Sequence, residues 1–225
     1  MYRAVIFDVD GTLVDSNDAH ANAWVMALAE RGRRVEFSRV RPLIGMGGDK
    51  LLPEVAGIAA DSPEGQAIDA RRRAIFQSEF LPHLKPTRGA RDLLEGLRDD
   101  RMTLVVASSA SSAELHGLLQ VAGAEKLMDS TTSSDDADRS KPDPDIVKAA
   151  IARTGCPPVD VIMIGDTPYD IEAALRAGIE IIALRSGGWP DAELTGAVAI
   201  YTDPADLLDH YDLSPFKRPA PLRSA

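Results

Sequence analysis

The chain opens on a short apolar run that ends in two carboxylates, AVIFDVDG at residues 4–11. An apolar, β-branched run of this length without a turn residue is typical of a strand buried on both faces of a sheet. Alternate strand residues point to the same side, so we expect Asp8 and Asp10 to share a face where the strand ends. Gly11 allows a sharp backbone turn at that point. Because neighbouring carboxylates repel each other unless a cation or a proton lies between them, the run indicates either a divalent-metal site or a solvated acidic turn.

Further apolar runs alternate with helical patterns along the rest of the chain. We expect strands at residues 102–107, 127–131, 159–164, 179–184 and 197–201. We expect helices at residues 90–98, 112–122, 144–153, 168–178 and 204–210. Strands that alternate with helices in this way predict an α/β fold with a doubly wound parallel sheet and helices on both of its faces.

The stretch that follows the first strand does not fit this alternation. Residues 18–31 have the spacing of an amphipathic helix, and residues 34–80 continue as helical pieces broken by proline and glycine, without a convincing strand. We therefore expect a smaller all-helical domain, residues 16–83, inserted after the first strand. The core is then formed by residues 1–15 and 84–225.

Polar residues follow several of the predicted strands at the point where each strand ends. Asp8 and Asp10 follow the first apolar run, Ser108 follows the second, and Asp166 follows the run at 159–164. Open α/β sheets bind ligands at this edge. Asp8, Asp10 and Asp166 make a set of hard oxygen ligands that suits Mg²⁺, and the absence of His and Cys from these motifs disfavours zinc.

Three more residues are candidates, each with an ordinary alternative. Lys141, held before a proline, either neutralises a phosphoryl oxygen or is simply solvated. Asp170, four residues after Asp166, either faces the water molecules bound to the metal, or holds Lys141, or interacts favourably with the dipole of its own helix. Ser108, with Ser109 and the N–H groups that follow, either cradles a phosphate or caps a helix.

Composition limits the classes of partner and the compartment. The net charge of −10 argues against nucleic acid and against anionic membranes, although one lysine and a metal can still bind a small phosphorylated substrate. No run is long enough to span a membrane, and the chain begins with its first strand, which leaves no room for a signal peptide. The single cysteine, Cys156, suits a reducing compartment. We therefore expect a cytoplasmic protein.

The order of these motifs resembles the haloacid dehalogenase (HAD) superfamily of phosphatases and phosphomutases. The motifs are D-x-D-G-T, a hydroxyl residue after an apolar strand, a lysine before proline, and G-D-x-x-x-D, and they lie between Asp8 and Asp170. The resemblance implies a Rossmann-like core with a helical cap inserted after the first motif.

The resemblance also implies roles for the motif residues. Asp8 attacks phosphorus to give an aspartyl-phosphate, and Asp10 protonates the leaving oxygen and then activates the hydrolytic water. Mg²⁺ is held by the carboxylates of Asp8 and Asp166 and by the backbone carbonyl of Asp10. Ser108 and Lys141 bind the transferring group. The dehalogenases of the superfamily lack the second aspartate, so Asp10 argues against that chemistry.

Within the superfamily, residues 15–24 resemble β-phosphoglucomutase and its phosphatase relatives. The resemblance implies that His20 lies near Asp10 and gates it, whereas the alternative is a solvent-facing helix residue. The mutase has cations that hold the far phosphate of a bisphosphate. This chain has Ile44 and Gly48 at those positions, and the absence of the cations favours simple hydrolysis. Arg41, nearby, either contacts the substrate or is solvated on the cap surface.

These inferences lead to one preferred hypothesis and two alternatives. The preferred one is a Mg²⁺-dependent phosphatase that acts, as a monomer, on a small phosphomonoester such as a sugar phosphate or phosphoglycolate. The first alternative is a sugar phosphomutase. The second is a receiver-type signalling domain that carries a stable aspartyl-phosphate, which fits less well because such a domain has its acceptor aspartate mid-chain and needs no inserted cap.

Overall fold

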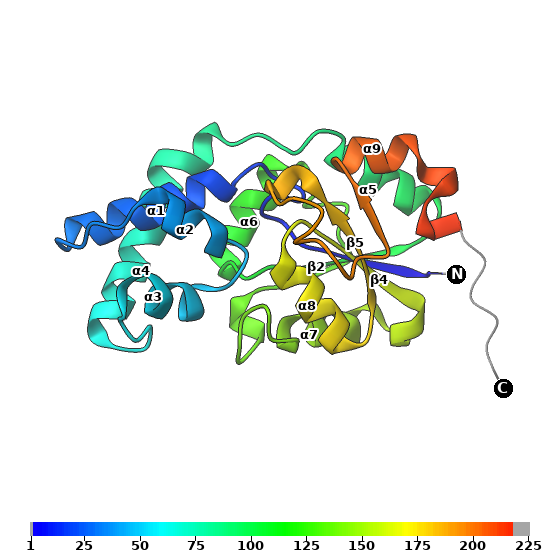
Figure 1. Ribbon diagram of the computed structural model, residues 1–225. Helices are drawn as coiled ribbons and strands as arrows, with labels where there is room; N and C mark the ends of the chain where they lie inside the picture. Colours follow the sequence, from blue (N-terminus) through cyan, green and yellow to red (C-terminus); the bar gives the residue numbers. More distant parts are fainter. Residues whose placement is uncertain (1, 218–225) are drawn as a thin grey trace.

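The computed structural model describes residues 2–217, which contain one parallel sheet with helices on both faces (Figure 1). The strand order is β3-β2-β1-β4-β5-β6, and every neighbouring pair is parallel. The strands are β1 (Ala4–Phe7), β2 (Thr103–Ala107), β3 (Ser130–Thr132), β4 (Val161–Gly165), β5 (Glu180–Leu184) and β6 (Ala199–Tyr201). The doubly wound α/β fold predicted from the sequence is confirmed. The last residues of the predicted core, 218–225, lie outside the described part of the chain.

The helices fall into a group that follows β1 and a group that alternates with the later strands. The first group is α1 (Asn17–Glu30), α2 (Phe37–Val40), α3 (Gly48–Ala56) and α4 (Pro63–Ile75). The second is α5 (Ala90–Asp99), α6 (Ser112–Val121), α7 (Asp145–Thr154), α8 (Pro168–Ala177) and α9 (Pro204–Asp209).

The sequence of β1 explains why both faces of the sheet are covered. All four residues of the strand are fully buried, and alternate side chains point to opposite faces. Val5 and Phe7 pack in one apolar cluster with residues of α5 and α6. Ala4 and Ile6 pack in a second cluster with residues of α7 and α8. An apolar residue at every position is what a strand between two helical layers requires.

The strand order reverses direction next to β1, and this position fixes the ligand site. The chain builds β1, β2 and β3 outward in one direction and then returns to place β4 on the other side of β1. Such a reversal opens a crevice outside the carboxyl ends of the two central strands. Asp8 follows β1 directly and Asp166 follows β4 directly, so both lie at this crevice.

The helices α1 to α4 gather at one end of the molecule, on the left in Figure 1. The two chain segments that connect them to the sheet run side by side: the Asp15 N–H donates to the Lys85 carbonyl, and the Thr87 N–H donates to the Leu13 carbonyl, both at 3.0 Å. We call residues 16–83 the helical insert. Its division from the core as a separate domain stays a prediction.

Some predicted strand boundaries were wrong, and local contacts explain the differences. Val159 was assigned to a strand, but it lies in the 3₁₀ turn Pro158–Asp160 and is 65% exposed. Leu127 and Met128 were also assigned to a strand, but their N–H groups bond to the Ala124 carbonyl in a turn. Apolar character alone does not distinguish a strand residue from a residue of a turn, whether that turn is exposed or packs against the core.

None of the helices within residues 2–217 has both the length and the apolar character that a membrane crossing would need.

Candidate active site

The turn after β1 brings its two carboxylates to the carboxyl edge of the sheet. The Asp8 N–H continues the ladder by donating to the Ile164 carbonyl of β4 at 2.9 Å, and the side chain is buried. Gly11 has a φ of +75°, and a Cβ there would lie 2.2 Å from Asp166 Oδ2. The turn therefore needs glycine both for its conformation and for the close approach of the β4 carboxylate.

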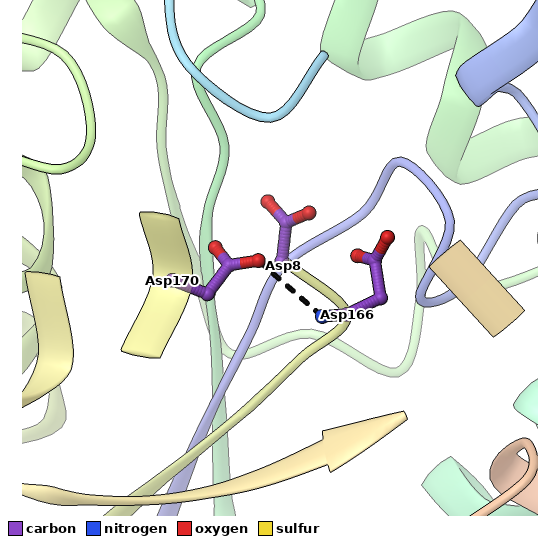
Figure 2. Close-up of side chains that lie close together, drawn as sticks. All are labelled: Asp8, Asp166 and Asp170. Carbon is purple, nitrogen blue, oxygen red and sulfur yellow. Dashed lines mark hydrogen bonds between the residues drawn. The ribbon is translucent and has the colours of Figure 1, made fainter. Parts of the chain in front are cut away.

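Asp8 lies close to Asp166 and Asp170 although it comes from a distant part of the sequence (Figure 2). Each offers one carboxylate oxygen, and these oxygens lie within 4.8 Å of one another. The Asp166 carboxylate is held from the first loop: Thr12 Oγ1 donates to Oδ1 at 2.8 Å, and Asn17 Nδ2 donates to Oδ2 at 3.0 Å. All three carboxylates are buried.

Lys141 lies between two of these carboxylates. Its Nζ donates to Asp8 Oδ1 at 2.5 Å and lies 2.7 Å from Asp170 Oδ1, and its side chain is 1% exposed. The other Asp170 oxygen accepts hydrogen bonds from the Thr167 N–H and Oγ1 at the start of α8. Of the alternatives open for Asp170, two therefore describe its surroundings: it contacts Lys141, and it lies in the first turn of α8, where it forms a capping box with Thr167.

The charge balance of this cluster favours a bound cation. Burial raises the pKa of Asp8 to about 7 despite the opposing effect of Lys141, and repulsion from Asp170 contributes. Burial, with repulsion from Asp8 and Asp170, also raises the pKa of Asp166 well above its ordinary value. Although burial would lower the pKa of Lys141, Asp170 and Asp8 raise it. Three buried acids thus share one cation within the described residues, and a hard divalent ion bound by carboxylate oxygen fits this donor set.

Asp10 has its own set of partners, which come from the helical insert. Its Oδ1 accepts a hydrogen bond from Ser16 Oγ at 2.5 Å and lies 2.7 Å from His20 Nε2. The His20 ring stacks on Phe76 with centroids 3.9 Å apart, which fixes the ring plane. Although burial would raise the pKa of Asp10, His20 and Ser16 lower it below its ordinary value. His20 therefore lies where the resemblance implied and is buried.

An open pocket lies between the sheet edge and the helical insert. The core contributes Asp8, Asp10, Ser109, Ala110 and Glu114. The insert contributes His20, Trp24, Arg72 and residues 44–48. Carboxylates therefore lie on the core side, and a mixed polar and apolar wall faces them.

The two serines after β2 differ in their surroundings. Ser108 is fully buried and its Oγ accepts a hydrogen bond from the Ala110 N–H at 3.1 Å. It is not the N-cap of α6, because Ser111 occupies that position. Ser109 lines the pocket, and its buried Oγ has no hydrogen-bond partner within the described residues. Of the two, Ser109 is the one with a free hydroxyl at the pocket.

The hydrogen bonds of Arg41 go to residues outside the set of candidates. Its Nε donates to Asp18 Oδ1 at 2.5 Å, and its Nη2 donates to the Gly187 carbonyl at 2.7 Å. Arg41 is not among the residues that line the pocket. Its guanidinium links the helical insert to the loop after β5, and its contact with substrate stays a prediction.

Several residues at the site were missed by the sequence interpretation. Thr12, Ser16 and Asn17 hold the carboxylates of Asp166 and Asp10, and their position just after the first motif was the available indication. Arg72 and Glu114 line the pocket as an ion pair at 2.6 Å. They lie 42 residues apart on helices with otherwise ordinary surface composition, so no local pattern joins them.

Comparison with known proteins identifies the family. A model described as "Haloacid dehalogenase-like hydrolase" matches residues 5–184. The chain belongs to the haloacid dehalogenase-like hydrolases. It is a phosphoric monoester hydrolase, in keeping with relatives that are named as phosphatases.

Two relatives and one solved structure illustrate the match. A validoxylamine A 7′-phosphate phosphatase from Streptomyces hygroscopicus subsp. limoneus is 30% identical over 185 residues, which cover 82% of this chain and 86% of the relative. A phosphoglycolate phosphatase from Rhodospirillum rubrum is 30% identical over 225 residues, which cover 93% of this chain and 90% of the relative. The crystal structure of a hydrolase from Pseudomonas syringae superimposes with a TM-score of 0.87 at 29% identity and covers 93% of this chain and 98% of that one.

Proposed function

We propose that the protein is a Mg²⁺-dependent phosphatase that hydrolyses a small phosphomonoester, of the sugar phosphate or phosphoglycolate type, through an aspartyl-phosphate on Asp8. The observation that carries the proposal is the buried cluster of Asp8, Asp166 and Asp170, with Lys141 between two of the acids, next to a pocket that Asp8 and Asp10 line. A cytoplasmic, monomeric enzyme is part of the same proposal.

The carboxylates of Asp8 and Asp166, together with the Asp10 backbone carbonyl, would hold the ion. When bound, Mg²⁺ supplies positive charge that keeps these carboxylates ionised and neutralises the oxygens of the phosphoryl group. Asp170 is the less suitable ligand because its two oxygens already accept from the start of α8 and contact Lys141. We propose that it acts by holding Lys141.

In the first half-reaction, the Asp8 oxygen that is not bonded to Lys141 attacks phosphorus. The bond between phosphorus and the leaving oxygen breaks as Asp10 gives its proton to that oxygen. Lys141 and the free hydroxyl of Ser109 stabilise the charge on the transferring group. Covalent catalysis of this kind divides one difficult displacement into two easier ones.

In the second half-reaction, Asp10 takes a proton from a water molecule whose oxygen attacks phosphorus. The bond between phosphorus and Asp8 breaks, inorganic phosphate leaves, and Asp10 again carries a proton for the next cycle. His20 and Ser16 keep the Asp10 carboxylate in one orientation during both steps. General acid–base catalysis requires that the group stays within reach of both protons that it transfers, and this fixed orientation of Asp10 meets that requirement.

A panel of phosphomonoesters, assayed for phosphate release with Mg²⁺ and with EDTA, tests the proposal. We expect turnover of at least one substrate with Mg²⁺ and none with EDTA. Asp8→Asn is expected to lower kcat by about 10⁴-fold or more, as the loss of a covalent nucleophile does elsewhere. The exposed control Asp99→Asn is expected to behave like the wild type. Retained phosphatase activity in Asp8→Asn would falsify the role of Asp8.

A phosphomutase remains the second candidate, and the pocket disfavours it. A mutase must hold the far phosphate of a bisphosphate, yet the insert contributes Ile44 and Gly48 where cations would be needed. Hexose 1-phosphate with a trace of its bisphosphate separates the two: we expect free phosphate to form faster than the isomeric hexose phosphate, and the opposite order would identify a mutase.

A further inference from the structure

One wall of the pocket contains an ion pair that crosses from the helical insert to the core. Arg72 Nη1 on α4 lies 2.6 Å from Glu114 Oε1 on α6, and both side chains are largely buried, at 11% and 6% exposure. Arg72 Nη2 also lies 3.0 Å from Asp69 Oδ1. The guanidinium carbon lies 5.2 Å from the centre of the Trp24 ring, which holds the side chain against the wall.

These contacts leave the wall without spare positive charge. Arg72 is matched by two carboxylates, those of Glu114 and Asp69. The other lining residue that can carry positive charge, His20, lies between Asp10 and Glu114, at 2.7 and 3.5 Å. Among the lining residues that the structure describes, no cation is therefore left for a second anionic group of a substrate. Burying an unpaired anion at such a wall is costly.

The wall nevertheless has free hydrogen-bonding capacity. Arg72 Nε and Glu114 Oε2 are buried and have no hydrogen-bond partner within residues 2–217. Buried polar atoms without partners are rare and indicate a missing ligand or water. One of these atoms is a donor and the other an acceptor, and a hydroxyl group satisfies both kinds, whereas a carboxylate or phosphate only accepts.

We propose that Arg72 and Glu114 make this enzyme selective for phosphomonoesters whose leaving group is neutral and hydroxylated, and that they disfavour leaving groups with a carboxylate or a second phosphate. The inference rests on the proposed phosphatase function and narrows its substrate class to phosphorylated sugars and polyols. Selectivity arises here mainly by repulsion, because the Glu114 carboxylate lines the same pocket as the reacting Asp8.

Two matched substrate pairs test the inference on the wild-type enzyme. Glycerol 3-phosphate and 3-phosphoglycerate differ in one position, where a hydroxymethyl group replaces a carboxylate. Glucose 1-phosphate and glucose 1,6-bisphosphate differ by one phosphate. In each pair, we expect kcat/KM to be at least about tenfold higher for the substrate with the uncharged leaving group, glycerol 3-phosphate or glucose 1-phosphate. A tenfold ratio corresponds to about 1.4 kcal/mol. p-Nitrophenyl phosphate serves as the general measure of phosphatase activity.

Glu114→Gln removes the negative charge while keeping the shape of the side chain. We expect this variant to lower the preference for glycerol 3-phosphate over 3-phosphoglycerate by about tenfold, because Arg72 then has one carboxylate fewer to neutralise it. Arg71→Gln is the matched control: Arg71 lies next to Arg72 on α4, is 48% exposed and pairs with Glu30. This control is expected to keep the wild-type preference.

The outcomes separate the inference from the function on which it rests. Equal kcat/KM for both members of each pair, with p-nitrophenyl phosphate turned over, would overturn the inference and leave the phosphatase proposal standing. An unchanged preference in Glu114→Gln would overturn the role of the Arg72–Glu114 pair. A purely structural defect would lower kcat/KM for both members alike and leave their ratio unchanged. No hydrolysis of any substrate with Mg²⁺ would overturn the phosphatase proposal and the inference with it.

Discussion

Lys141 Nζ donates a hydrogen bond to Asp8 Oδ1 at 2.5 Å, and the lysine side chain is almost completely buried. The two residues lie 133 positions apart and meet because β1 and the loop before α7 both reach the carboxyl edge of the sheet. Lys141 also contacts Asp170 at 2.7 Å. This lysine therefore has two functions to test: it stabilises a buried acidic cluster, and it orients the carboxylate that we propose as nucleophile.

Lys141→Met is expected to destabilise the metal-free protein. Breaking a buried ion pair by removing one partner typically costs about 3–5 kcal/mol, because the remaining charge stays buried. We expect the free energy of unfolding, measured by urea titration in EDTA, to fall by about that amount. Lys148→Met, which replaces an exposed lysine on α7, should change it by less than about 0.5 kcal/mol. Equal losses in the two variants would contradict a buried, paired role for Lys141.

The fold could be predicted because its determinants are local. The residues of β1 are apolar at every position, and later apolar runs alternate with helical patterns, which together specify a doubly wound sheet. The ends of elements were less predictable. Val159 has the residue type of a strand, yet the two prolines before it and its exposure place it in a turn.

Site residues could be predicted from the sequence only where they directly follow a strand. Asp8 and Asp166 directly follow β1 and β4, so the parallel sheet brings them together at one edge. Glu114 and Arg72 meet only because two helices pack across the pocket, and that contact has no pattern in the sequence. Arg41 shows the converse: it is a cation near the expected site, yet its partners, Asp18 and the Gly187 carbonyl, are not among the residues that line the pocket.

The raised pKa of Asp8 predicts how the stability of the metal-free protein depends on pH. The pKa is about 7 in the folded chain and 3.8 ordinarily, so between these values the folded state holds a proton that the unfolded state has lost. Stability falls with rising pH wherever the folded state binds more protons. Asp8 therefore lowers the free energy of unfolding between about pH 4 and pH 7, by roughly 4 kcal/mol over that range.

Thermal unfolding in EDTA and in Mg²⁺ at pH 5 and pH 7.5 measures this effect. We expect Mg²⁺ to raise Tm more at pH 7.5, because the ion binds the ionised carboxylates and competes with protons at pH 5. In EDTA, the wild type should lose stability as the pH rises while Asp8→Asn does not, so the variant should become the more stable of the two by a growing margin. A difference that is constant with pH would show that Asp8 does not carry the titration.

Asn17 is expected to control metal affinity without touching the metal. Its Nδ2 donates to Asp166 Oδ2 at 3.0 Å and so fixes one proposed ligand. Loss of such a supporting hydrogen bond typically costs 10- to 100-fold in metal affinity, so we expect Asn17→Ala to raise the half-saturating Mg²⁺ concentration by about that factor. At saturating Mg²⁺, kcat should recover to within a few-fold. Asn22→Ala is the control, since that exposed amide donates to the Asp18 carbonyl of the same helix.

His20→Gln is expected to change the pH dependence of catalysis. His20 Nε2 lies 2.7 Å from Asp10 Oδ1 and lowers the pKa of Asp10 against the effect of burial, and glutamine keeps a hydrogen-bond donor but cannot carry a positive charge. The pKa of Asp10 should therefore rise, and the limb of the kcat/KM profile that Asp10 governs should move by about one pH unit to higher pH. His116→Gln, which replaces a histidine that is 61% exposed on α6, should leave the profile unchanged. If His20 only packs against Phe76, the variant will lose activity equally at every pH and the limb will stay where it is, because a packing defect does not alter the charge beside Asp10.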